Sequence, residues 1–151
     1  MNRMDQLYQD MILDHNKNPR NYGDIKGHTH KAKGINPICG DNYELFITMK
    51  ADIIENIGFK GSGCAISKSS ASMMTSLLKG KTREEALELK ECFINLVTKG
   101  CDGQCDTCLG KLKVFEGVKK YPIRIKCATL IWRALESALN QNSSMNKETK
   151  T

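Results

Sequence analysis

The sequence has no apolar run long enough to cross a membrane. Its longest uncharged apolar stretches, such as Ala65–Ile66 and Ala128–Trp132, are far shorter than the roughly 20 residues that a bilayer requires. The first residues, Met1–Asp10, contain no apolar signal core. We therefore expect a cytoplasmic protein with no membrane segment.

The chain also lacks the features of a nucleic-acid-binding protein, although one of its segments is strongly basic. Lys111–Lys126 carries six Lys or Arg residues against the single acid Glu116, and Tyr121 is its only Tyr or Trp. No nucleic-acid recognition motif accompanies this charge. Two interpretations of the segment stay open, a solvated surface and a docking surface for an acidic partner.

No internal repeat and no long linker divides the 151 residues. A hydrophobic share of 40% and a formal net charge of +6 are typical of a domain with a buried core, and exclude a fibrous, collagen-like or wholly disordered chain. We expect one domain over residues 1–139, followed by a disordered polar tail over residues 140–151.

The apolar patterning predicts an α+β fold in which several helices pack on a small antiparallel three-stranded sheet. Alternating apolar residues over Tyr43–Met49 and a β-rich run over Ile53–Lys60 predict a hairpin, and an earlier strand is expected within Lys26–Gly34. Helical spacing and capping signals predict helices over about 3–16, 66–78, 82–97, 112–116 and 127–139.

Cysteines are numerous for a chain of this length. There are seven, at positions 39, 64, 92, 101, 105, 108 and 127, and an odd number cannot all pair within one chain. In a reducing compartment, such cysteines more often bind metal or carry out thiol chemistry than form disulfides.

Three of these cysteines lie where the predicted secondary structure changes. Cys39 precedes the hairpin, Cys64 follows it, and Cys127 opens the predicted last helix. A helix N-terminus lowers the pKa of a thiol, and Asp41 lies close enough to Cys39 to reach the same centre. Three thiolates and a carboxylate suit zinc and can also hold an iron–sulfur cluster. The spacing alone is equally compatible with cysteines that act as small buried hydrophobic residues.

Four short motifs occur in order along the chain. They are Leu13–Asn21 (LDHNKNPRN), Asn36–Asp41 (NPICGD), Gly61–Ser67 (GSGCAIS) with Ser70–Met74 (SASMM), and Arg124–Leu130 (RIKCATL). Together they resemble the motifs of the IscU/NifU-N superfamily, whose members work in iron–sulfur cluster assembly. The resemblance extends from about Leu7 to Leu139.

Within that superfamily the chain is more similar to the SufU-like branch than to the IscU-like scaffold branch. Lys126 stands directly before Cys127, where the scaffold branch usually has histidine, and this gives the Arg-x-Lys-Cys form of the SufU-like branch. The long gap between Cys64 and Cys127 accommodates the insertion of that branch. The Leu-Pro-Pro-Val-Lys segment by which scaffolds bind a chaperone is absent near Gly117–Arg124.

The resemblance implies a zinc protein that accepts sulfur from a pyridoxal-phosphate-dependent, SufS-like cysteine desulfurase and works with downstream cluster-assembly proteins. It implies Cys39, Asp41, Cys64 and Cys127 as zinc ligands and Cys39 as the sulfur acceptor. Arg124, with Lys126, is expected to stabilise anionic sulfur or to meet acidic groups of the desulfurase. Two alternatives stay open: a scaffold on which an iron–sulfur cluster is assembled, and a zinc-stabilised interaction module without sulfur transfer.

The chain departs from the family in one segment, Cys101–Cys108, where we expect polar residues and no cysteine. Cys101, Cys105 and Cys108 have the density of a metal-binding knuckle, and Cys92 could supply a fourth ligand. Three interpretations stay open here: a second metal site, a redox-active or disulfide-forming thiol cluster, and inert local variation.

Overall fold

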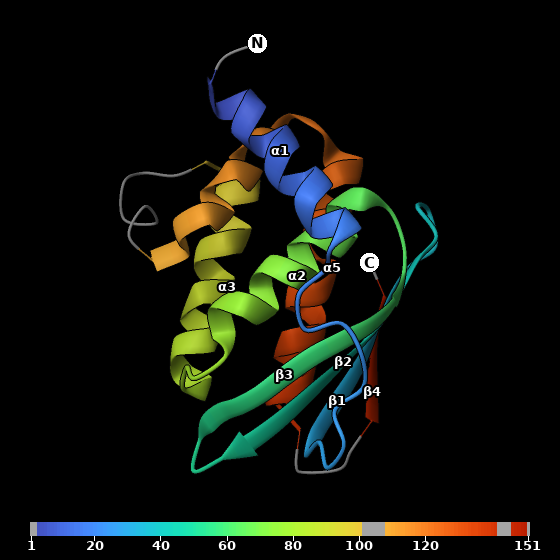
Figure 1. Ribbon diagram of the computed structural model, residues 1–151, viewed down its shortest axis with the longest axis vertical. Coiled ribbons are helices and arrows are strands. Elements are labelled where there is room, and N and C mark those ends of the chain that lie inside the picture. The colour runs from blue at the N-terminus through green and yellow to red at the C-terminus, as the bar shows by residue number, and fades with distance from the viewer. Residues whose placement is uncertain (1–2, 101–107, 142–145, 151) are drawn as a thin grey trace.

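The computed structural model describes residues 3–100, 108–141 and 146–150. Its elements follow in the order α1 (Arg3–Lys17), β1 (His30–Asn36), β2 (Asp41–Lys50), β3 (Ile53–Ser62), α2 (Ala65–Leu78), α3 (Arg83–Thr98), the 3-10 helix η1 (Gly110–Lys120), α5 (Pro122–Leu139) and β4 (Asn146–Lys150). The helices gather on one face of the sheet (Figure 1). Among the described helices, none combines the length and the apolar character that a membrane span requires.

The sheet contains the predicted three antiparallel strands. Strand β2 pairs antiparallel with both β1 and β3, and the α+β prediction is therefore confirmed. One strand is added, because β4 pairs parallel with β1 and gives the strand order β3-β2-β1-β4. The disordered tail predicted over residues 140–151 is therefore wrong for Asn146–Lys150. The segment Asn146–Lys150 has no apolar residue, but it can still join a sheet, since an edge strand offers it backbone hydrogen bonds.

Aromatic packing fixes the position of α5 in the core. The rings of Phe93 on α3 and Trp132 on α5 stack with centroids 4.7 Å apart, and Phe115 of η1 packs on Phe93 at 5.7 Å. All three side chains are fully buried. Because α5 also packs on β1 and α2, this core holds the buried residue Cys127 of α5 in a fixed place.

One helix start was predicted from its capping residues, and the start of the last helix was predicted wrongly. Thr82 and Glu85 form the expected capping box at the start of α3, and Cys64 is the N-cap residue of α2. The last helix, by contrast, begins at Pro122 and not at Cys127. Proline is tolerated in the first turn of a helix, because the backbone N–H groups of that turn have no hydrogen-bond partner within the helix. Cys127 therefore lies in the second turn, and the helix-terminus argument does not apply to its thiol.

Candidate metal centre

One end of the sheet brings the predicted site residues together. A four-residue turn over 37–40 joins β1 to β2 and carries Cys39. Gly40 closes this turn with a φ of +74°, a backbone conformation that glycine adopts without strain. Asn36 and Asp41 face each other as the pair that closes the hairpin. Strand β3 ends beside this turn, so Cys64 follows at the same edge.

Three of the predicted ligands form a compact group. The donor atoms of Cys39, Asp41 and Cys127 all lie within 4.8 Å of one another, and the sulfur atoms of Cys39 and Cys127 are 3.2 Å apart. Asp41 and Cys127 are buried, with exposed fractions of 1% and 2%. In tetrahedral zinc sites, Zn–S distances of about 2.3 Å place two sulfurs about 3.8 Å apart. The group is therefore of the right size and chemistry to hold one zinc ion.

The carboxylate of Asp41 is fixed through one of its two oxygens. Oδ1 accepts a hydrogen bond from the backbone N–H of Cys64 at 2.9 Å and another from the hydroxyl of Ser67 at 2.9 Å. From the described residues, Oδ2 accepts a single, longer bond, from the side-chain amide of Asn36 at 3.3 Å. Oδ2 is therefore the oxygen left to face a metal ion.

Cys64 lies beside the compact group and interacts with it through Cys127. As the N-cap residue of α2, its sulfur accepts a hydrogen bond from the backbone N–H of Ser67 at 3.4 Å. A hydrogen bond from the Cys127 thiol, helped by those from Ser67, lowers the pKa of Cys64 to about 6. The same interaction, together with burial, raises the pKa of Cys127. Of the pair Cys64 and Cys127, Cys64 is therefore the thiol that ionises first.

Arg124 lies one helical turn before Cys127, at the exposed start of α5. Its guanidinium stacks over the ring of Tyr121 at 4.4 Å, and it lines a surface hollow of about 460 Å³ with Tyr8, Lys119 and others. Burial raises the pKa of Tyr8, Arg124 opposes that rise, and Cys64 and Cys127 add to it. Tyr8 therefore lies within electrostatic range of both Arg124 and the cysteines.

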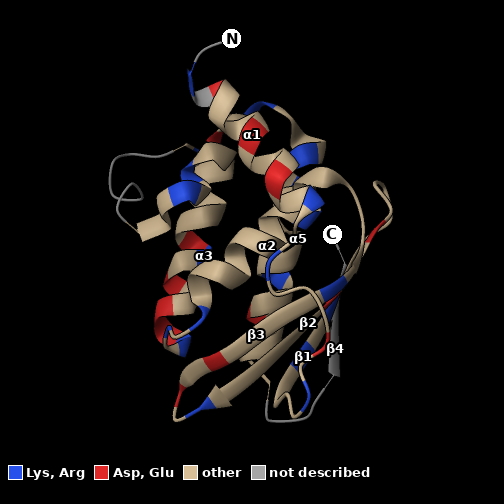
Figure 2. Cartoon of the chain, in the orientation of Figure 1, with Lys and Arg blue, Asp and Glu red and all other residues tan. Residues whose placement is uncertain are grey.

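The basic residues Lys119, Lys120 and Arg124 line this hollow together with the acids Asp5 and Glu116. Figure 2 marks the positions of basic residues along the chain of η1 and the start of α5, where the basic segment identified in the sequence is located. Of its residues, Lys119 has an acidic neighbour, since it lies 3.8 Å from Glu116. The segment ends at the exposed residue Lys126, which directly precedes the buried Cys127.

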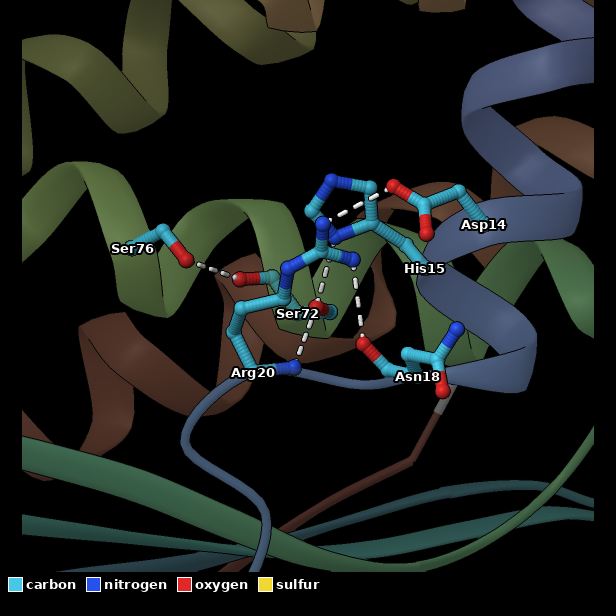
Figure 3. A network of polar contacts seen from close by, with 6 residues as sticks. All are labelled: Asp14, His15, Asn18, Arg20, Ser72 and Ser76. Carbon is cyan, nitrogen blue, oxygen red and sulfur yellow. Dashed lines mark hydrogen bonds and ion pairs between the residues drawn. The ribbon is translucent and has the colours of Figure 1, made fainter.

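The Leu13–Asn21 motif forms a clamp between helices rather than part of the metal group. The ring of His15 and the backbone N–H of Arg20 both hydrogen-bond the hydroxyl of Ser72, at 2.7 and 2.8 Å (Figure 3). The guanidinium of Arg20 binds Asp14 at 2.8 Å and the carbonyl of Asn18 at 3.0 Å. These contacts fasten the end of α1 and the chain after it to α2.

The cysteine-rich segment is only partly described. Cys101 and Cys105 lie outside the described residues, whereas Cys92 is half-buried on α3 and Cys108 is exposed. A second metal site, one of the three interpretations of these cysteines, therefore stays untested, as do the other two.

Sequence reasoning missed the residues that hold the ligands in place. The sequence motif includes Ser67 without giving it a role, yet its hydroxyl anchors Asp41 and its backbone N–H anchors Cys64. Its position three residues after the N-cap cysteine is the signal that could have identified it. Asn36 lies in a recognised motif, but its spacing from Cys127 gives no indication that the two side chains meet.

Replacing Gly63 with alanine is expected to disrupt this arrangement. A Cβ atom at Gly63 would lie 2.4 Å from Oδ1 of Asp41 and 2.8 Å from both the Ser67 hydroxyl and the Tyr43 hydroxyl. The carboxylate must then move away from its two donors. We expect weaker zinc binding, measured by competition with a chelator. Gly117→Ala is the matched control, because no atom of the described residues lies within 4 Å of its Cβ position, and it should leave zinc affinity unchanged.

Comparison with known proteins places the chain in a family. The model of the NifU-like N terminal domain matches residues 7–128. The chain belongs to this family, which the IscU and SufU proteins of iron–sulfur cluster assembly share.

Two curated relatives are similar over nearly their full length. The zinc-dependent sulfurtransferase SufU of Bacillus subtilis is 42% identical over 144 residues, which cover 95% of this chain and 96% of the relative. The iron–sulfur cluster assembly scaffold protein IscU of Streptococcus pyogenes is 38% identical over 144 residues, covering 95% and 89%. Relatives of similar identity to this chain are thus named for two different activities, sulfur transfer and cluster scaffolding.

Solved structures share the fold. A crystal structure described as an iron–sulfur cluster assembly scaffold protein for the SUF system, from Fervidobacterium islandicum, superposes with a TM-score of 0.83. It is 36% identical, and the match covers 89% of this chain and 98% of that one. The likeness confirms the predicted SufU-like and IscU-like fold.

Proposed function

We propose that this protein is a zinc-dependent sulfur acceptor, which takes sulfur from the persulfide of a pyridoxal-phosphate-dependent cysteine desulfurase for iron–sulfur cluster assembly. The observation that carries the proposal is the position of Cys39. This candidate metal ligand lies in an exposed turn, whereas the two donors grouped with it, Asp41 and Cys127, are buried. The similarity to a relative named as a zinc-dependent sulfurtransferase supports it.

The proposed zinc ligands are Cys39, Asp41, Cys64 and Cys127. The first, second and fourth already form the compact group, and Cys64 contacts that group through Cys127. Three sulfurs and one oxygen complete a tetrahedral set. When bound, zinc keeps the sulfurs as thiolates at neutral pH without redox chemistry of its own.

Cys39 is the proposed acceptor because its surroundings allow it to meet a partner. Its neighbours in the turn, Pro37 and Ile38, are exposed, Ile38 by 64%. The thiolate of Cys39 attacks the outer sulfur of the desulfurase persulfide. One S–S bond forms on Cys39 as the S–S bond of the desulfurase breaks, and the desulfurase cysteine leaves as a thiolate. The exchange needs no external oxidant or reductant.

Basic residues at the start of α5 are the proposed contacts for the desulfurase. Arg124 and Lys126 are both exposed in the part of α5 that precedes Cys127. Their charge suits acidic groups on the partner and the anionic persulfide. Exposed Ile38 and Ile123 add apolar contact area at the same end of the molecule.

A scaffold function is the second candidate, favoured by the relatives that carry the scaffold name. Protein purified without air separates the two. A sulfur acceptor contains zinc and no acid-labile sulfide, whereas a scaffold contains iron and acid-labile sulfide in comparable amounts. A zinc-stabilised interaction module contains zinc but gains no sulfur from a desulfurase.

The transfer itself is tested with a desulfurase of this class and free cysteine. We expect the desulfurase to turn over several times faster when this protein is added, because the persulfide is removed from the enzyme. Mass spectrometry should find one added sulfur atom on the peptide that contains Cys39. Turnover that stays at the rate of the desulfurase alone, with no sulfur on any peptide, contradicts the proposal.

A further inference from the structure

Asn36 is a buried polar side chain next to the candidate metal group. It is the last residue of β1, its exposed fraction is 0%, and it faces Asp41 across the β1–β2 hairpin. Helix α5, which carries Cys127, packs against the same strand. The amide therefore lies between two elements that each supply a proposed ligand.

Both hydrogen bonds of this amide go to proposed ligands. Its Nδ2 lies 3.3 Å from Oδ2 of Asp41 and 3.7 Å from the sulfur of Cys127. A carboxylate and a thiolate only accept hydrogen bonds, so the NH₂ group, and not the carbonyl, must face them. Each of its two hydrogens then has one acceptor, and the amide bridges β2 and α5.

The carbonyl oxygen of the Asn36 side chain indicates that the two contacts of Nδ2 have a role besides stabilising the fold. Within the described part of the chain, Oδ1 of Asn36 is buried and has no hydrogen-bond partner. A buried carbonyl without a partner destabilises a fold. An apolar side chain of similar size would avoid this loss, but it could not donate to Asp41 and Cys127.

The ligands are supported unequally. Asp41 is fixed by Cys64, Ser67 and Asn36, and Cys127 by its buried helix and Asn36. Cys39 has its 3.2 Å contact with Cys127, and the described residues provide its side chain with no other hydrogen bond. Asn36 thus supports two donors that must stay in place and does not support the one that must leave.

We propose that Asn36 is a positioning residue that holds Asp41 and Cys127 on the zinc ion while Cys39 exchanges. The inference rests on the zinc site of the proposed function. In other metal proteins, loss of such an outer hydrogen-bond donor weakens metal binding by about 10–100-fold.

Asn36→Leu tests the first consequence. The variant loses the two hydrogen bonds that Nδ2 donates, but it also loses the buried carbonyl that has no partner. Because the second change offsets the first, the zinc-free variant should unfold at the same denaturant concentration as the wild type or at a higher one. Its zinc affinity, measured by chelator competition, should fall about 10–100-fold. Thr48→Val is the matched control, because the hydroxyl of Thr48 is also buried and has no partner among the described residues, but lies near the far end of β2. It should leave zinc affinity unchanged.

Alkylation of the zinc-loaded protein by iodoacetamide tests the second consequence. In the wild type, mass spectrometry should find Cys39 modified first and Cys127 protected. In Asn36→Leu, Cys127 should be modified at a rate approaching that of Cys39, while Cys64, held by Ser67, stays protected. Equal modification of Cys64 and Cys127 overturns the proposal, since it indicates general loosening of the fold.

Unchanged zinc affinity and unchanged protection of Cys127 in the variant also overturn the role of Asn36. The proposed function survives that result if the wild type binds zinc and gains sulfur on Cys39. A wild-type chain that binds no zinc overturns both proposals, and the two failures are therefore distinguishable.

Discussion

Cys127→Ser is expected to remove the zinc ion and to destabilise the metal-loaded protein by several kcal/mol. Structural zinc stabilises small domains by on the order of 10 kcal/mol at neutral pH. The loss is smaller here because the chain retains its own aromatic core around Trp132. Metal analysis and denaturant unfolding of zinc-loaded and zinc-free samples measure both effects.

The zinc-free samples provide the first control for this experiment. Serine is close to cysteine in size, so the substitution alone should change the unfolding free energy by about 1 kcal/mol. Cys92→Ser provides the second control, because Cys92 lies on α3 away from the metal group. It should keep the zinc content of the wild type. Full zinc content in Cys127→Ser would contradict the assignment of this ligand.

Local signals in the sequence predicted much of the fold. Alternation of apolar residues identified the β2–β3 hairpin, and the Thr82 and Glu85 pair identified the start of α3. Such features depend on residues a few positions apart, so a single sequence displays them. The parallel pairing of β4 with β1 depends on backbone contact between distant segments, and polar residues gave no signal for it.

The same distinction applies to the candidate site. The cysteines and Asp41 could be predicted as a group because the segments that carry them resemble known motifs. The hydrogen bonds that hold the ligands could not, because they join residues 26 positions apart for Ser67 and Asp41 and 91 apart for Asn36 and Cys127. Only the folded chain brings these pairs together.

The start of α5 shows how a wrong boundary changes a chemical argument. A helix beginning at Cys127 would have lowered the pKa of its thiol through the helix dipole. Because α5 begins at Pro122, it is Cys64, the N-cap of α2, that lies at a helix N-terminus, where hydrogen bonds from Ser67 add to the lowering of its pKa by Cys127. The thiol with the lowered pKa is therefore held at the edge of the group, next to the residues that fix it.

Unequal support among the ligands leads to the prediction with the largest effect on function. Cys39→Ser should abolish sulfur acceptance and return desulfurase turnover to the rate of the enzyme alone. Asp41, Cys64 and Cys127 remain to bind zinc, and the fold should persist because Cys39 lies in a turn outside the core. Circular dichroism and metal analysis check the fold and the zinc, and mass spectrometry checks the sulfur.

Simultaneous replacement of Cys101, Cys105 and Cys108 by serine is the counterpart of that variant. It removes the cysteines that are unexpected for the family and leaves every proposed zinc ligand in place. If Cys39 is the acceptor, this triple variant should gain sulfur and stimulate the desulfurase nearly as well as the wild type. Sulfur found only on the peptide that contains Cys101 to Cys108 would instead mean that transfer depends on the segment particular to this chain.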